Sequence, residues 1–441
     1  MKQEKVGWKY KLPFLLLAVI AILSLIPVTY ANEIPEGVVI DHADTAWMLM
    51  ASALVLLMTP GLAFFYGGMV RYKNLVSTLL QSFVALGIIS VLWVVIGFSL
   101  AFGDSIGGFI GNPFTFAFFK NVGVAPNPAF ATTIPFALFA MFQLKFAIIT
   151  PALITGGLAE RVRFSSLLLF ICLFSLFIYA PLAHMTWHPD GILRNWGVLD
   201  FAGGTVVHIS AGFAALSGAM FLGRRKGKTE NEPTNIPYIL LGTGLLWFGW
   251  FGFNAGSALA ADGVATTAFV NTNIASATAM LTWLLGDGAL GKKRSAVGAA
   301  VVGAVVGLVA ITPAAGFVTV GQSIFIGFVA AIVSYTAVRY KSKSNIDDTL
   351  DVFSCHGLGG IVGMILTGVF AKNVGLTSGE THTFIFHLLA LVLVSIFTFA
   401  GSYLLYKVTD MILPMRVTPE QEEKGLDLTQ HGEEAFDFRT K

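Results

Sequence analysis

The stretch Asp200-Phe-Ala-Gly-Gly-Thr-Val-Val-His208 places an aspartate at the start of an apolar segment and a histidine inside it. A second stretch, Asp351-Val-Phe-Ser-Cys-His356, repeats this arrangement in the other half of the chain. Titratable groups inside hydrocarbon are costly in free energy, so they usually mark a polar pathway through a membrane protein. The two stretches therefore predict a pore built from paired repeats.

The composition supports a membrane setting. Of 441 residues, 55% are hydrophobic and only 12% are charged, whereas a soluble domain carries about 25% charged residues. The mean hydropathy is +0.76, which predicts a polytopic membrane protein in contact with membrane lipid. The net charge of +2 is too small to indicate nucleic acid as a partner. Cys172 and Cys355 both lie in apolar segments and indicate neither a disulfide framework nor a Cys-rich metal site.

Residues 1–31 are typical of a secretory signal. Four lysines precede an apolar run from Leu12 to Ile26, and a small-residue cleavage site ends at Ala31. Because the apolar run is long, an uncleaved first span is the alternative. Either choice leaves the next segment entering from outside.

From residue 44 onward, eleven segments approach the roughly 20 residues needed to cross a bilayer. They lie at roughly 44–67, 77–102, 133–158, 165–187, 202–222, 236–257, 264–285, 296–312, 317–338, 351–371 and 384–412. Lysine and arginine gather in alternate loops, so the positive-inside rule places the N-terminus outside and the C-terminus in the cytoplasm. We expect an all-α polytopic membrane protein with eleven transmembrane helices.

The number of spans predicts how the two halves are related. If the first five spans and the next five are repeats, their odd number forces opposite orientations. His208 then lies in a segment that enters from outside, and His356 in one that enters from the cytoplasm. Asp200 and Asp351 would support these segments at the outer and inner ends. The expected architecture is two inverted five-helix repeats around a central pore.

The two histidines admit three interpretations. A lone membrane histidine usually makes an interhelical hydrogen bond, but two at matched positions favour a functional pathway. Neutral imidazoles donate and accept hydrogen bonds, so His208 and His356 could line a dry pore for a small neutral polar molecule. A metal site is the third interpretation, and it lacks a convincing carboxylate as third ligand.

Aromatic residues gather toward the outer side. Phe142 and Phe146 share a helix face at i and i+4, and so do Phe253 and Ser257 near the outer end of the sixth span. Trp187 ends the fourth span on that side. Core packing or an interfacial belt would explain each residue alone. Together they provide π faces and a hydroxyl that suit a small cation.

The motifs resemble one family, in order, from Asp44 through the tail. They are Ala63-Phe-Phe-Tyr-Gly-Gly68, Phe142-Gln143, Phe146-Ala147, Gly157-Leu-Ala-Glu-Arg161, Asp200 to His208, Trp250-Phe-Gly-Phe-Asn-Ala-Gly-Ser257 and Asp348-Thr-Leu-Asp-Val-Phe353 followed by His356-Gly357. This set resembles the ammonium transporters of the Amt/Mep/Rh superfamily, on the bacterial and archaeal Amt side. The resemblance implies a transporter rather than an enzyme, with no cofactor.

The resemblance also implies roles for individual residues. Phe142, Trp187 and Ser257 would recruit ammonium outside, with Asp200 supporting that site by capping local backbone. Phe146 and Phe253 would form a stacked gate, and His208 and His356 would line the pore. Ammonium would lose a proton and cross as ammonia, a route closed to potassium. The sequence does not decide whether the proton returns outside or crosses separately.

The resemblance further implies partners and a domain organisation. We expect a homotrimer with a pore in each subunit, a transport domain over 32–413 and a cytoplasmic regulatory tail over 414–441. By composition alone the tail could be disordered or docked on the cytoplasmic loops. A P-II-type nitrogen regulatory protein would bind the cytoplasmic face, which leaves ammonium sensing open as a second role. Lys145 departs from the family pattern, since related sequences usually carry an uncharged residue there; snorkelling or a subunit contact would accommodate it.

Overall fold

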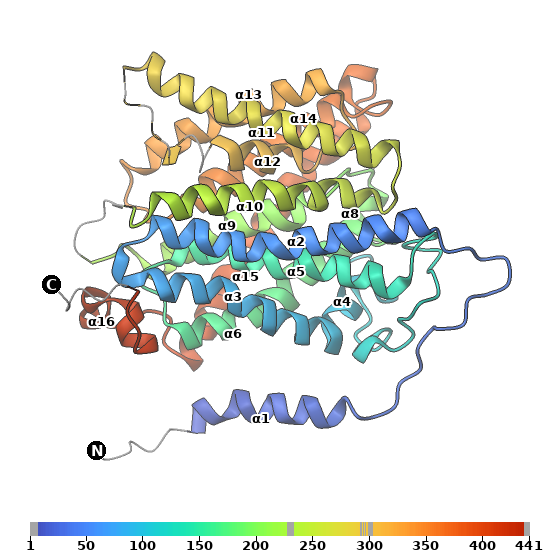
Figure 1. Cartoon of the computed structure of the whole chain (residues 1–441), viewed down its shortest axis with the longest axis horizontal. Helices are drawn as coiled ribbons and strands as arrows, with labels where there is room; N and C mark the ends of the chain where they lie inside the picture. The colour runs from blue at the N-terminus through green and yellow to red at the C-terminus, as the bar shows by residue number, and fades with distance from the viewer. Residues whose placement is uncertain are drawn as a thin grey trace.

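The computed structural model describes residues 8–226, 233–291, 293, 295, 297–298 and 303–435. It is an α-helical bundle in which most long helices run side by side (Figure 1). The helices are α1 Trp8–Leu23, α2 His42–Met69, α3 Leu75–Leu92, α4 Phe98–Phe102, α5 Phe136–Leu158, α6 Phe164–Phe174, α7 Ala180–Trp187, α8 Ile192–Asn195, α9 Ser210–Leu222, α10 Ile236–Ala255, α11 Gly263–Ala289, α12 Val305–Ile311, α13 Val320–Lys341, α14 Leu358–Phe370, α15 His382–Ile412 and α16 Pro419–Lys424.

Among the fully described elements, π-helical segments extend or interrupt these helices at η2 Trp93–Gly97, η4 Ser175–Tyr179, η5 Gly204–Ile209, η8 Phe353–Gly357 and η10 Asp427–His431. Short 3₁₀ turns occur at η1 Tyr72–Asn74, η3 Ala117–Phe119, η6 Gly256–Ala258 and η9 Leu376–Ser378. A small antiparallel hairpin pairs β1 Ser105–Ile106 with β2 Ile110–Gly111. Helices dominate because a chain in lipid must satisfy its backbone hydrogen bonds within each segment.

In the described part of the chain, nine helical segments are long and apolar enough to cross a membrane. They are His42–Met69, Tyr72–Phe102, Phe136–Leu158, Phe164–Asn195, Gly204–Leu222, Ile236–Ala258, Val320–Lys341, Phe353–Phe370 and His382–Ile412. Each overlaps an expected span. The expected span 264–285 coincides with α11, which is long enough to cross a membrane, but its polar residues lower its mean hydropathy below that of the nine segments. The expected span 296–312 coincides partly with α12 and partly with residues outside the described ranges.

The helices at the centre of the bundle are those with the largest share of buried residues. In the most apolar 18-residue stretch of α5, and in that of η5 with α9, 78% of the stretch is buried, whereas the corresponding shares for α13 and α15 are 33% and 28%. Helices α5 and α9 therefore form the interior, and α13 and α15 present much of their surface outward. The helix α1 lies apart from the bundle (Figure 1).

The segment before α2 contacts a long loop between α4 and α5. The Asn121 amide donates to the Thr29 carbonyl (2.7 Å), and the Ala125 amide donates to the Ala31 carbonyl (2.9 Å). The expected cleavage site at Ala31 thus lies within a docked segment. Cleavage of residues 1–31 stays a prediction.

Candidate functional site

The two histidines meet in the centre of the bundle. His208 lies in η5 and His356 in η8, and their Nδ1 atoms are 3.3 Å apart. Both side chains are buried, with 1% and 3% of their surface exposed. The fold therefore brings together two polar rings that are 148 residues apart in the chain.

Asp200 organises the start of the first histidine segment. Its carboxylate accepts hydrogen bonds from the amides of Gly203 (2.7 Å), Gly204 (2.6 Å) and Thr205 (2.7 Å). The first amides of a helix lack partners within the helix and favour negative charge, so this aspartate stabilises the start of η5. The Asp200 carbonyl also accepts a hydrogen bond from Trp187 Nε1 (3.1 Å). One residue thus positions both a histidine segment and the Trp187 side chain.

The structure corrects our expectation for Asp351. The contact equivalent to that of Asp200 belongs to Asp348, whose Oδ2 accepts a hydrogen bond from the Phe353 amide (2.8 Å). Asp351 instead pairs with Lys341 (2.5 Å) and has a left-handed backbone with φ 59°. Asp348 lies eight residues before His356, the same spacing that separates Asp200 from His208. That spacing in the sequence would have selected the correct aspartate.

The two histidine segments cross at two glycines that have the same spacing from their histidines. Gly212 and Gly360 each lie four residues after their histidine. A Cβ atom on Gly212 would lie 2.3 Å from the Gly357 amide nitrogen, and one on Gly360 would lie 3.3 Å from His208 Cβ. These close approaches allow the two histidine rings to come within hydrogen-bonding distance. The matched positions indicate that the two segments are structurally equivalent.

The aromatic residues form a column that ends at the histidines. Phe146 stacks on Phe253 with ring centroids 4.2 Å apart and an interplanar angle of 29°. Phe142 and Trp187 contact the Phe146 ring edge-on, at 5.0 Å and 5.8 Å. On the other side, the Phe253 ring lies 6.0 Å from the His208 ring. The three phenylalanine side chains are 1% exposed, so the column excludes open solvent.

Ser257 lies one helical turn after Phe253, in η6. Its hydroxyl donates to the Phe253 carbonyl (2.9 Å), which leaves the oxygen lone pairs able to accept. Ser257 and Trp187 are partly exposed, unlike the buried phenylalanines. Of the residues expected to recruit a cation, Trp187 and Ser257 are therefore more accessible than the expected gate residues, whereas Phe142 is as buried as they are.

Comparisons with known proteins identify the family of this chain. A model of the Ammonium Transporter Family matches residues 46–436. The chain belongs to this family. It is therefore a multi-pass membrane protein with a mostly helical fold, as the resemblance of its motifs predicted.

Curated members of the family match nearly end to end. The chain is 46% identical to the ammonium transporter of Bacillus subtilis (strain 168), over 89% of this chain and 98% of that protein. It is 44% identical to the ammonium transporter Amt1 of Archaeoglobus fulgidus, over 90% of this chain and 100% of that protein.

Solved structures of the family share the fold. The crystal structure of Saccharomyces cerevisiae Mep2 superposes with a TM-score of 0.83 and 35% identity, covering 91% of this chain and 93% of that one. A structure described as a sensor Amt protein superposes with a TM-score of 0.80 and 30% identity, covering 88% of this chain and 98% of that one.

Two polar contacts in this Ammonium Transporter Family member were not predicted from its sequence. Trp250 stacks on His208 with centroids 5.4 Å apart, and its Nε1 donates to the Thr312 hydroxyl (2.9 Å). The Thr312 oxygen lies 3.3 Å from His208 Nε2. Trp250 is the first residue of the family motif Trp250 to Ser257. Thr312 belongs to no such motif, and only the tertiary structure brings the end of α12 to the histidines.

A third buried histidine supports the segment that leads to Asp200. His387 Nε2 accepts a hydrogen bond from the Leu199 amide (2.9 Å), and its Nδ1 lies 2.8 Å from the Met364 carbonyl. The feature of the sequence that could have identified it is a histidine within an apolar span.

Lys145 is partly buried in α5 and has no ion-pair partner within the described ranges.

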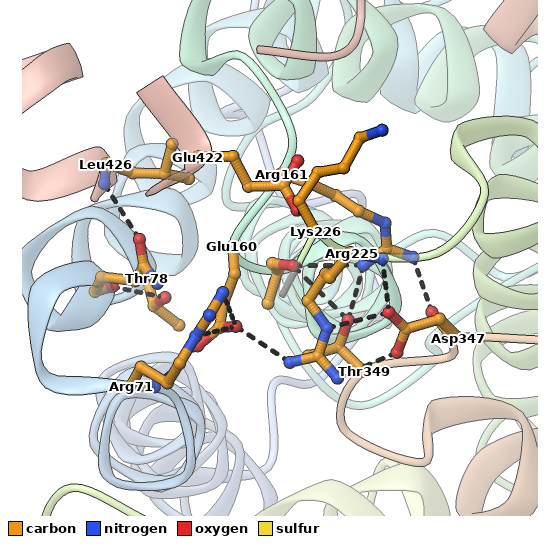
Figure 2. Close-up of polar contacts among 12 residues, drawn as sticks. Arg71, Thr78, Glu160, Arg161, Arg225, Lys226, Asp347, Thr349, Glu422 and Leu426 are labelled. Atoms are coloured by element: carbon orange, nitrogen blue, oxygen red, sulfur yellow. Dashed lines mark hydrogen bonds and ion pairs between the residues drawn. The ribbon is translucent and has the colours of Figure 1, made fainter. Parts of the chain in front are cut away.

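A buried ionic cluster joins loops that are far apart in the chain (Figure 2). Arg225 pairs with Glu160 (2.9 Å) and with Asp347 (2.9 Å), and Glu160 also pairs with Arg71 (2.7 Å). Burial opposes ionisation of Asp347, but hydrogen bonds and charge from Arg225 lower its pKa to about 2. Burial likewise opposes ionisation of Glu160, and the charge of Arg225 and contacts with Arg71 hold its pKa below the ordinary value.

The C-terminal tail is docked beside this cluster, as far as residue 435. Buried Glu422 pairs with Arg416 (2.9 Å) and accepts a hydrogen bond from the Lys226 amide. Asp427 accepts hydrogen bonds from the Val76 and Ser77 amides, at 3.0 Å and 2.8 Å, in the first turn of α3. The sequence left disorder and docking open for this tail, and the structure shows a docked segment. Figure 1 places α16 at the end of the bundle near the C-terminus.

Proposed function

We propose that the chain transports ammonium selectively by deprotonating it and conducting ammonia. Phe142, Trp187 and Ser257 recruit the cation at the outer side. Ammonia then passes the gate formed by Phe146 and Phe253. The observation that carries this proposal is the 4.2 Å stack of the two gate rings between the outer aromatic residues and the histidines.

The stack makes passage of a hydrated ion costly. Moving an unpaired ion into a dry apolar medium costs on the order of tens of kcal/mol by Born estimates. Ammonium avoids this cost by losing a proton, because ammonia is neutral and forms hydrogen bonds. Potassium has no proton to lose. Selectivity then depends on this chemical difference rather than on ion size.

The histidine pair stabilises ammonia beyond the gate. His208 and His356 lie on the inner side of the Phe253 ring, and ring nitrogens donate or accept hydrogen bonds. Net uptake is electrogenic, with the proton carried separately from ammonia. Asp200 and Asp348 hold the two histidine segments in place through backbone amides.

The proposed architecture has eleven spans, two inverted five-helix repeats, an outer N-terminus and a cytoplasmic C-terminus. The equivalent aspartate, histidine and glycine positions in the two histidine segments support the repeats.

The protein assembles as a homotrimer, and residues 1–31 are removed as a signal peptide. A P-II-type regulatory protein binds at the cytoplasmic face, where the docked tail over 414–435 offers a surface.

A neutral ammonia channel is the alternative mode of transport, and ammonium sensing is a second candidate function. Sensing is favoured by the structural similarity to a protein described as a sensor Amt. In that case, occupancy of the pore would be transmitted through the docked tail to a cytoplasmic partner.

The test measures ammonium-evoked current in proteoliposomes that contain the purified protein, with potassium pulses as control. A saturable current for ammonium but not potassium supports electrogenic transport. Rapid internal alkalinisation without current indicates a neutral ammonia channel. The absence of both signals would refute transport and leave sensing. Replacing both pore histidines with alanine should abolish selectivity, provided that the unaltered protein excludes potassium in the same assay.

A further inference from the structure

The hydroxyl of Thr312 is a junction of three polar contacts beside the histidine pair. Thr312 follows α12 and is fully buried. Its oxygen lies 2.9 Å from Trp250 Nε1, 2.8 Å from the Leu308 carbonyl oxygen and 3.3 Å from His208 Nε2. A threonine hydroxyl has one hydrogen to donate and two lone pairs that accept. The three contacts therefore require one donation and two acceptances.

Two of these contacts have a fixed direction. The Leu308 carbonyl can only accept, and the Trp250 indole N–H can only donate. The Thr312 amide donates to Val309 instead (3.2 Å), so the hydroxyl is the Thr312 group that reaches the Leu308 carbonyl. With its only hydrogen directed to Leu308, the Thr312 oxygen accepts from Trp250. It must also accept from His208 Nε2, which therefore carries a hydrogen.

The direction of the hydrogen bond between the two histidines follows from the same argument. A neutral His208 with hydrogen on Nε2 has a lone pair on Nδ1. His356 Nδ1 faces that lone pair at 3.3 Å, so it carries the hydrogen of this contact. His356 then has its own lone pair on Nε2, for which the described residues show no hydrogen bond.

We propose that Thr312 fixes the tautomers of both histidines and is a positioning residue for ammonia conduction. Thr312 orders the hydrogen bonds in one direction, from His356 Nδ1 to His208 Nδ1 and from His208 Nε2 to Thr312. The pair consequently offers one free acceptor, His356 Nε2, to an N–H group of the conducted molecule. The role in conduction rests on the proposed function, whereas the tautomer assignment rests only on the contacts above.

The decisive experiment is nitrogen NMR of protein labelled with ¹⁵N at histidine, because the shifts of the two ring nitrogens report which one carries hydrogen. His208→Ala and His356→Ala variants assign the signals. In the unaltered protein we expect hydrogen on Nε2 of His208 and on Nδ1 of His356. Hydrogen on Nδ1 of His208 would overturn the proposal.

Substitutions of Thr312 test the cause. Thr312→Ser keeps the hydroxyl and should preserve both tautomers. Thr312→Val keeps the shape but removes the acceptor, which leaves a buried N–H on His208 without a partner. We expect the tautomer ratio to shift by about tenfold or more toward hydrogen on His208 Nδ1. Unchanged tautomers in Thr312→Val would also overturn the proposal.

A matched control separates this effect from general loss of structure. Thr367 in α14 is also fully buried and donates to the carbonyl four residues earlier, that of Gly363 (2.7 Å). Thr367→Val should leave the histidine signals unchanged; a shift equal to that of Thr312→Val would refute a specific role for Thr312. Ammonium-evoked current, measured in parallel, should fall in Thr312→Val and recover in Thr312→Ser. If the unaltered protein carries no ammonium, the proposed function fails while the tautomer assignment is still decided by NMR.

Discussion

The crossing at Gly212 predicts a sharp effect of a single methyl group. In Gly212→Ala the new Cβ would lie 2.3 Å from the Gly357 nitrogen, while ordinary contact begins at 3.4 Å. The two histidine segments must then separate by the difference, about 1.1 Å, because backbone atoms on both sides cannot rotate away. The distance between His208 Nδ1 and His356 Nδ1 would increase from 3.3 Å to about 4.4 Å, beyond the range of a hydrogen bond.

We expect two measurable results from this separation. Overpacking of a close-packed site destabilises the fold by about 1–3 kcal/mol, which should lower the thermal unfolding midpoint in detergent. Loss of one buried hydrogen bond, worth about 1 kcal/mol, should reduce ammonium-evoked current about five- to tenfold. Both quantities are measured on the same purified protein, and the current is normalised to the amount of folded protein.

The control is Gly244→Ala in α10, where an added Cβ meets no atom within 4 Å. Alanine is favoured over glycine in a helix interior, so this variant should be unchanged or slightly more stable. If Gly212→Ala shows the unfolding midpoint and current of the unaltered protein, the close crossing does not hold the histidines together and our reasoning is wrong.

Other predictions concern the charged residues. Asp348→Ala should lower stability by about 0.5–2 kcal/mol through loss of a helix cap, whereas Asp351→Ala, which breaks a partly exposed ion pair, should cost about 1 kcal/mol or less; thermal unfolding compares them. Asp347→Asn leaves Arg225 with an unbalanced buried charge and should cost about 3–5 kcal/mol. Because the Asp347 pKa is lowered to about 2, its stabilisation is present above the ordinary value of 3.8 and is lost in unfolding experiments as the pH falls from there toward 2. Burial lowers the pKa of His431, so the neutral form favours the docked tail, and limited proteolysis of the tail should increase as the pH falls below the ordinary value of 6.5.

Most of the candidate site residues were predicted from polar groups that lie within apolar spans. His208 and His356 were identified because titratable residues are rare in such segments, and the structure places them in contact. Phe142 and Phe146 were identified from helical spacing, and the structure stacks Phe146 against Phe253. The roles of these residues stay predictions, and the family match confirms the predicted family.

The remaining features depend on tertiary structure. The choice of Asp348 over Asp351 is the exception, because its eight-residue spacing from His356 matches that of Asp200 from His208. Thr312 acts only because α12 ends beside Trp250 and His208. Contacts of this kind join segments far apart in the chain and leave no local pattern to read.

The ionic cluster around Arg225 has a consequence for how the molecule can move. Arg225 lies in the connection between the two proposed repeats and pairs with Glu160, which follows α5, and with Asp347, which follows α13. Transporters that alternate access rock one half against the other as rigid bodies. Such rocking would separate these buried pairs in every cycle and leave buried charges without their partners, which is strongly unfavourable. The cluster therefore opposes such rocking, and for the gate that we propose we expect opening by rotation of the two phenylalanine rings while the helices keep their places.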